Sequence, residues 1–237
     1  MLGLGDTEPV DPAKVLRMNR DITIVRRPFE GNISGCFLRG QPSSVVILNS
    51  KRTVGHQNFT LAHEFYHVEF EPELQGSVCP IEDASDDRPD SERLADEFAA
   101  NFLVPAEGID ELMYRQVKGE RSHVDMASLI EMEQYFGVSH RAMLRRMKET
   151  GWLDDEKVEE FKEGITSFAR LLGYDTSLYS KPENFEILSP YVRLARDSYE
   201  KGKITWGKFC QLLGEAGLGD LIGAEEETCV ENEDRER

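Results

Sequence analysis

The chain has 237 residues, of which 39% are hydrophobic and 31% are charged, and its formal net charge is −17. This composition suits one sizeable domain, or one domain with a helical annex, and it excludes wholesale disorder. So acidic a surface repels phosphate backbones and anionic lipid headgroups, which argues against nucleic acid and membranes and favours a basic protein or peptide partner.

The N-terminal part is expected to hold a short helix and a small sheet. Asp11 and Pro12 are typical of a helix start, and the helix is expected to run to about Asn19. Three stretches rich in β-forming residues follow, separated by turn residues, at 22–25, 35–38 and 45–48. We expect these stretches to form a mostly antiparallel sheet.

Two further helices are expected after the sheet. Residues 59–70 carry apolar side chains around most of a helical circumference, which is typical of a buried helix. Residues 71–90 contain three prolines and several acidic residues, so we expect a connection there. The second helix is expected from about residue 91 to residue 103, because Pro105 stops it.

The remainder of the chain is expected to be helical. Residues 126–136 and 140–148, joined by Gly-Val-Ser, are typical of a helix-turn-helix. The other expected helices lie at 106–118, about 155–172, 189–201 and 205–213, and a charged tail covers 225–237.

The sharpest motif is H-E-x-x-H at residues 63–67. On a helix, His63 and His67 lie on one face, so their imidazoles can bind one zinc ion. Glu64 is placed to act as general base on a water at the metal. A catalytic zinc needs a third protein ligand, and Glu92 begins the next helix. Asp96 follows one turn later and can orient a ligand imidazole by a hydrogen bond.

These two blocks carry a resemblance to a known family. Residues 59–67, and residues 92–105 with Glu92-x-x-Ala95-Asp96 and a final Phe-Leu-Val-Pro, closely resemble the ImmA/IrrE family of metallopeptidases. The resemblance covers roughly residues 10–150. Tyr66 replaces a frequent glycine, and residues 57–58 replace a pair that frequently bears arginine, so details of the substrate cleft are open.

The resemblance implies an intracellular, cytoplasmic zinc peptidase with one zinc per chain. It implies ligands at His63, His67 and Glu92 and a base at Glu64. Members typically cleave a helix-turn-helix repressor and thereby switch on genes, so the implied partner is such a protein. The scattered cysteines, the N-terminus without a signal-like pattern and the absence of a ~20-residue apolar run also predict a cytoplasmic protein.

The expected fold class is α+β: a small, mostly antiparallel sheet packed on the metal-binding helices, followed by an all-helical C-terminal part. We expect a zinc metallopeptidase domain at 1–118, a helix-turn-helix-like segment at 119–150 and a helical region with a charged tail at 151–237.

Several features have more than one interpretation. The oxyanion of the reaction needs a second electrophile, and the candidates are Tyr66, Tyr114, Arg115 and His123, although each also suits ordinary packing or exposure. Cys79 is either a small hydrophobe or a thiolate that holds the zinc latent. His56 and His140 lie in polar contexts, which predicts exposure. The acidic residues between 82 and 90 lack a calcium-loop pattern and are expected to be solvated.

Other functions remain open on the sequence alone. The basic residues of 140–148 suit either DNA contact or a packing and docking unit, and we favour the second. Rival hypotheses are a metal-binding regulator that does not cleave its partner, a DNA-binding regulator with a vestigial site, and a toxin–antitoxin component. An intact Glu64 argues against a vestigial site.

Overall fold

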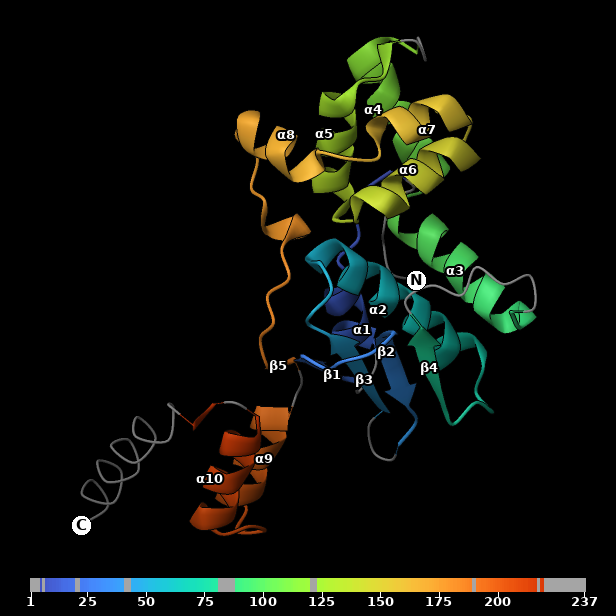
Figure 1. Cartoon of the computed structure of the whole chain (residues 1–237). Coiled ribbons are helices and arrows are strands. Elements are labelled where there is room, and N and C mark those ends of the chain that lie inside the picture. Colours follow the sequence, from blue (N-terminus) through green and yellow to red (C-terminus); the bar gives the residue numbers. More distant parts are fainter. Residues whose placement is uncertain are drawn as a thin grey trace.

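A computed structural model describes residues 5, 7–19, 22–40, 44–80, 88–119, 123–188, 191–216 and 218–219 of the chain (Figure 1). The fold class is α+β, with most of the helices following the sheet in the sequence. The predicted charged tail and the acidic residues 82, 83, 86 and 87 lie outside these residues.

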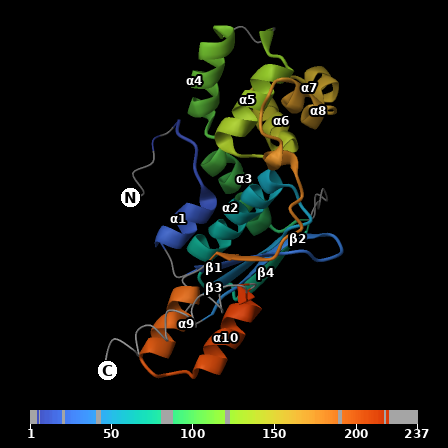
Figure 2. The same ribbon diagram turned by 90° about the vertical axis from the view of Figure 1, so that its left-hand side faces the viewer.

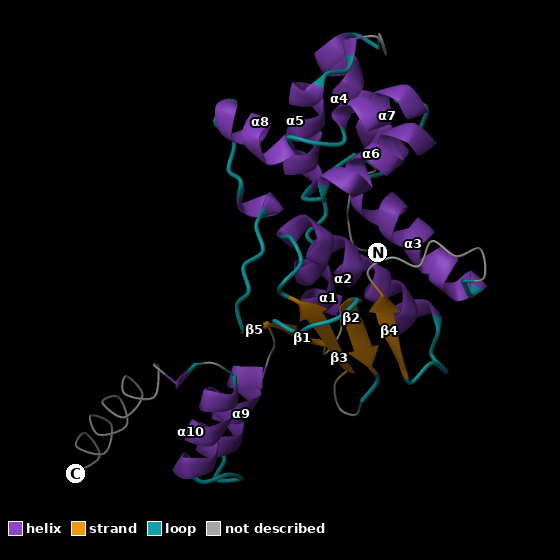
Figure 3. Ribbon diagram, in the orientation of Figure 1, coloured by secondary structure: helices purple, strands orange, loops and turns teal. Residues whose placement is uncertain are grey.

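Among the described residues, five strands form one sheet in the order β4-β2-β3-β1-β5 (Figure 3). Strands β1 and β3 are parallel, whereas the other three pairs are antiparallel, which confirms a mostly antiparallel sheet. The bounds are β1 Ile22–Arg27, β2 Ile33–Leu38, β3 Ser44–Asn49, β4 Gly76–Pro80 and β5 Glu186–Leu188.

Two of these strands are absent from the sequence-based expectation. β4 lies in the stretch that the prolines and acids mark as a connection, and β5 interrupts the C-terminal part that was expected to be all helical. Both are short edge strands, so pairing with β2 and β1 creates them and local propensity does not. Pro80 is tolerated because it ends an edge strand.

Helices α1 (Pro12–Asn19) and α2 (Val54–Phe70) cover one face of the sheet, and α3 (Asp90–Leu103) packs along α2 (Figures 1 and 2). α2 begins five residues earlier than predicted. Thr53 caps it by accepting a hydrogen bond from the backbone N–H of His56 at 3.3 Å. Gln57 is buried and donates to the Arg52 carbonyl, so a polar residue occupies an interior position that the apolar pattern does not predict.

The helix-turn-helix prediction is matched by α5 (Met126–Phe136) and α6 (His140–Glu149), joined at Gly137 with φ +66°. The expected helix at 155–172 is two helices, because the chain turns at Gly164, where φ is +85°. The other elements are α4 Ala106–Val117, α7 Asp155–Phe161, α8 Ile165–Leu171, a 3₁₀ turn at Ser177–Tyr179, α9 Tyr191–Glu200 and α10 Trp206–Glu215.

Three groups of buried apolar residues hold the described elements together. One lies between the sheet, α1 and α2, and a second runs from Ala62 of α2 through α3 to α7. The third joins α9 to α10, which lie on the side of the sheet away from α2 (Figure 2). The predicted domain division stays a prediction, although residues on both sides of position 118 share the second core.

Within the described residues, no helix combines the length and the apolar character that crossing a membrane requires.

Candidate metal centre

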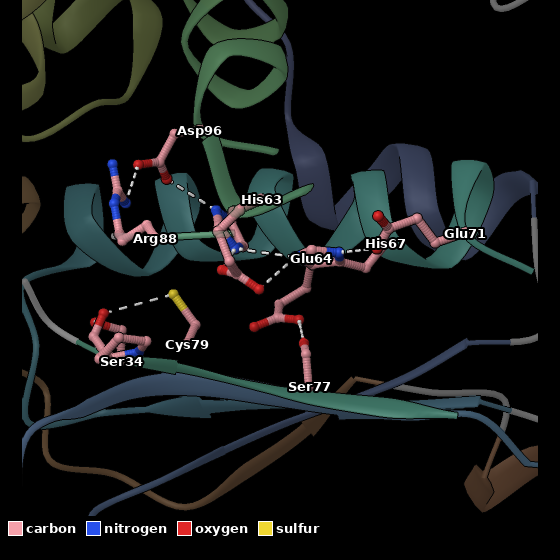
Figure 4. Close-up of polar contacts among 11 residues, drawn as sticks. Ser34, His63, Glu64, His67, Glu71, Ser77, Cys79, Arg88 and Asp96 are labelled. Atoms are coloured by element: carbon pink, nitrogen blue, oxygen red, sulfur yellow. Dashed lines mark hydrogen bonds and ion pairs between the residues drawn. The ribbon is translucent and has the colours of Figure 1, made fainter. Parts of the chain in front are cut away.

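The H-E-x-x-H residues lie on α2, enclosed between the sheet and α3. His63 is 2% exposed and His67 and Glu64 are 0% exposed, so none of the three is a surface residue. Because His63 and His67 are one helical turn apart, their Nε2 atoms face each other at 3.2 Å. Figure 4 shows the two side chains on the same face of the helix, directed toward each other.

The third donor comes from the first turn of α3. One oxygen of Glu92 is 3.1 Å from Nε2 of His63, and the other is 3.5 Å from Nε2 of His67. Ligand atoms at 2.0–2.1 Å around a tetrahedral zinc are about 3.3 Å apart, so the observed spacing suits one metal ion. His63, His67 and Glu92 are the one such donor group among the described residues, and they fit a divalent metal.

Carboxylates fix the orientation of both imidazoles. Nδ1 of His63 donates to Asp96 at 2.9 Å, and Nδ1 of His67 donates to Glu71 at 2.6 Å (Figure 4). Arg88 in turn donates to the second oxygen of Asp96 at 2.8 Å. With a proton on each Nδ1, the lone pair of each Nε2 is free for a cation, which is how metal-binding histidines are usually held.

The charges around His63 favour a cation at the same point. Burial works to lower the pKa of His63, but hydrogen bonds to Asp96, Cys79 and Glu92 outweigh it and raise that pKa to about 12. The hydrogen bond from His63 lowers the pKa of Glu92, so this carboxylate stays ionised. A positive charge between the rings and the carboxylate is therefore stabilised by its surroundings.

Glu64 points from α2 toward β4 and away from solvent. One oxygen accepts a hydrogen bond from Ser77 Oγ at 3.0 Å, and the other, Oε1, is buried with no hydrogen-bond partner among the described residues. Burial raises the pKa of Glu64 to about 7, although His63 and Ser77 oppose the shift. A carboxylate with a pKa near neutrality and an unused oxygen is suited to accept a proton from a nearby water.

The centre opens into a cleft of about 660 Å³ that runs between β4, α2, α3 and α6. Val78 and Cys79 of β4 form one wall, and residues of α6 close the far end. Cys79 is half-buried in this cleft beside His63, and burial raises the pKa of its thiol. Both interpretations of Cys79 stay open, although it lies in the cleft and not in the hydrophobic core.

The family model described as IrrE N-terminal-like domain, Peptidase_M78, matches residues 17–148, which is more than half of the chain. The chain belongs to this family. The match spans β1 to α6 and includes every residue of the metal centre. The membership and the three-donor group together support a metallopeptidase. No curated protein matches the chain significantly.

The four candidates for an oxyanion stabiliser do not line the cleft of this metallopeptidase-family chain. The Tyr66 ring packs against Phe70 and Phe98. Tyr114 is 71% exposed, Arg115 pairs with an acidic neighbour on α4, and His123 is exposed. Their predicted role has no support in this geometry.

The two histidines expected to be exposed are not, which is a correction to the sequence-based prediction. His140 is buried between Glu133 and the Phe161 carbonyl. His56 is half-buried in the cleft, with Nε2 at 2.8 Å from Ser34 Oγ. In both cases the partner comes from another element, so the polar local sequence gave a misleading signal.

Three residues of the site were missed by sequence reasoning: Glu71, Ser77 and Arg88. Glu71 follows His67 by four positions, so helical spacing could have identified it. Ser77 reaches Glu64 only because β4 pairs with β2, and Arg88 reaches Asp96 only because of the course of the chain before α3. No local signal marks these two.

Proposed function

We propose that this chain is a zinc-dependent endopeptidase, with His63, His67 and Glu92 as ligands of one zinc ion per chain and Glu64 as general base. The observation that carries the proposal is the 3.1–3.5 Å spacing of three buried or half-buried donors. Two imidazoles and one carboxylate that leave a position open are the ligand set of many catalytic zinc sites.

The chemistry divides between the metal and the chain. A bound zinc ion polarises a carbonyl and lowers the pKa of water at its open position to ~7. Glu64 takes the proton from the attacking water on its unpartnered Oε1 and delivers it to the leaving amine. Ser77 holds the other oxygen of Glu64, so the acceptor keeps one orientation.

The substrate is proposed to bind as an extended strand along β4. Among the described strands, β4 is at one edge of the sheet and pairs with β2 alone. Its free edge therefore offers backbone donors and acceptors to a peptide. Because Ser77 and Cys79 of this strand lie beside Glu64 and His63, a peptide paired with β4 passes the metal centre.

The physiological substrate is proposed to be a helix-turn-helix transcriptional repressor in the cytoplasm, whose cleavage switches on the repressed genes. The resemblance to the ImmA/IrrE family supports this choice. Docking on the α5–α6 pair is compatible with it, since α6 lines the cleft.

The test is the zinc content and the hydrolytic activity of the wild type beside Glu64→Gln and Glu92→Ala. We expect one zinc per chain in the wild type and in Glu64→Gln, and loss of zinc in Glu92→Ala. Activity on a peptide library should fall by about 10²–10⁴-fold in Glu64→Gln, because only the base is removed. Zinc without hydrolysis in the wild type would instead favour a non-cleaving metal-binding regulator.

A further inference from the structure

The described lining of the cleft has the opposite charge to the chain. Among the lining residues that the structure describes, six side chains are basic and three are acidic, although the whole chain has a net charge of −17. The acidic ones are Glu92, Asp96 and Glu149. The basic ones are Arg52, Arg88, Arg141, Arg145, Arg146 and Lys181.

Three of these cations form ion pairs with described acidic residues. Arg88 binds Asp96 beside the metal centre. Arg145 and Arg146 pair with Glu149, and Arg146 also donates to the Val104 carbonyl at 2.8 Å. Arg88 and Arg146 thereby hold elements together, whereas Arg145 and Glu149 form an exposed pair within α6, and the carboxylate partners offset much of these three positive charges.

The other basic residues lie around the N-terminal end of α2, because Arg52 and Arg141 both act on His56 and Ser180, next to Lys181, accepts a hydrogen bond from the backbone N–H of Val54 at 3.1 Å. Arg52 donates to the Gly31 carbonyl at 3.0 Å, but neither Arg52 nor Lys181 has an ion pair within the part of the chain that the structure describes, and Arg52 Nε is buried without a hydrogen-bond partner. Burial, followed by the charges of Arg52 and Arg141, lowers the pKa of His56 to about 4. The guanidinium groups of Arg52 and Arg141 are thus both close enough to the His56 ring to lower its pKa. An anion bound in this part of the cleft would offset the repulsion between the two guanidinium groups.

Two helix N-termini meet at the same place. The N-caps Thr53 of α2 and Ser139 of α6 both line the cleft. They are so close that a Cβ atom on Gly55 would lie 2.5 Å from the Ser139 backbone nitrogen. Each N-terminus carries about half a positive charge, which adds to the field of the arginines.

Helical geometry gives the distance between this hollow and the metal centre. His56, Thr60 and His63 lie on one face of α2, and all three line the cleft. The seven residues from His56 to His63 span about 10 Å at the rise of an α-helix. An extended peptide covers that distance in about three residues.

We propose that Arg52, Arg141 and Lys181 form a subsite for an aspartate or glutamate side chain of the substrate, about three residues from the cleaved bond. This inference rests on the proposed peptidase function and specifies its substrate class. The net charge of the chain favours a basic partner, whereas this subsite would bind an acidic side chain. The two expectations differ because the described lining of the cleft is positive although the whole chain is negative.

Nucleic acid is the weaker occupant of the same charges. Met143, Leu144 and Met147 bury one side of α6 in the core, and Arg146 is tied to Val104, so α6 is not a freely projecting recognition helix. A hollow of about 660 Å³ accommodates a peptide segment, and the acidic remainder of the chain repels a duplex.

The subsite can be tested by binding without catalysis. Calorimetric titration of zinc-loaded Glu64→Gln protein would use synthetic peptides in which three aspartates precede or follow six alternating alanines and serines. Matching asparagine peptides provide the reference. We expect at least one aspartate peptide to bind about tenfold more tightly than its asparagine counterpart at low salt.

Charge-reversal variants locate the effect. Arg141→Glu and Lys181→Glu change exposed side chains and should each abolish the preference for aspartate, as should Arg52→Glu. Lys208→Glu, an exposed residue of α10, makes the same charge change and should leave the preference intact.

Equal binding of aspartate and asparagine peptides, or a preference that survives all three reversals, would overturn the subsite. So would displacement of the aspartate peptide by a stoichiometric DNA duplex, which would assign the cations to nucleic acid. Hydrolysis by the wild type is measured separately. Its absence would count against the peptidase function, whereas the aspartate preference of Glu64→Gln alone decides the subsite.

Discussion

The metal centre and the α5–α6 helix pair both contain buried histidines that are held by carboxylates. In the metal centre, Nδ1 of His63 is bound by Asp96, while its Nε2 faces another imidazole at 3.2 Å. In the helix pair, Nδ1 of His140 lies 2.6 Å from Glu133, and its Nε2 donates to the Phe161 carbonyl at 2.7 Å.

The second ring nitrogen distinguishes the two regions. A carbonyl oxygen can only accept, so Nε2 of His140 carries a proton and has no lone pair for a metal. The nitrogens of His63 and His67 face each other and Glu92, an arrangement that leaves lone pairs directed at one point. A buried histidine–carboxylate pair is therefore a structural cross-link or part of a metal site according to its other contact.

The largest effect on activity and zinc binding is expected from removing one of the two metal-binding imidazoles. His67→Ala should abolish hydrolysis and zinc retention, because two donors remain and the cleft admits water. With zinc at 1,000 times its dissociation constant, the wild type should gain about 4 kcal/mol of stability and the variant almost none. Thermal unfolding with zinc and with a chelator measures this, and an equal zinc-dependent shift in both proteins would contradict the ligand assignment.

His140→Ala should destabilise the fold by about 3 kcal/mol without affecting zinc content, because it leaves Glu133 buried without its partner. The loss is at the low end for a buried pair, since the Tyr179 hydroxyl still donates to Glu133 at 2.9 Å. Urea unfolding compares the variant with the exposed control His123→Ala. A loss of zinc in His140→Ala would show that the two regions are not independent.

Asp96→Asn should weaken zinc binding by about 10–100-fold, because the amide orients the imidazole of His63 less strongly than a carboxylate. Competition against a fluorescent zinc chelator measures the change. Asp155→Asn, which removes an exposed ion pair with Lys148, is the matched control. Equal zinc affinity in both variants would mean that Asp96 does not support the ligand.

The smallest effect concerns pH. Burial opposes the charged form of His140, but its hydrogen bond with Glu133 outweighs this and raises the pKa of His140 in the folded state. A raised folded pKa gives stability that is complete below the unfolded value of about 6.5 and is lost as pH rises through the folded value. Burial also raises the pKa of Glu133, which acts in the same direction.

The free energy of unfolding of the zinc-free protein should therefore fall more between pH 6.5 and the higher folded pKa in the wild type than in His140→Gln. Urea titrations over this range, with the zinc ligands alanine-substituted in both proteins, isolate the effect. Parallel pH profiles would show that the pair holds no extra proton in the folded state.

Local sequence determined much of the site. The four-residue spacing of His63 and His67 places two imidazoles on one face of any α-helix, and an acid in the first turn of the next helix supplies Glu92. Helix and strand positions up to residue 49 and from 90 to 149 also follow from periodicity, caps and turn residues. These features need only the geometry of a single element.

Tertiary structure decided the rest. Strands β4 and β5 exist through pairing with distant strands, and Ser77 reaches Glu64 only because β4 runs beneath α2. The charge of the cleft also came from packing, because Arg52, Arg141 and Lys181 belong to three separate parts of an acidic chain. The spacing of residues along one helix can be predicted from the sequence alone. The contacts between elements depend on how the whole chain buries its apolar surface.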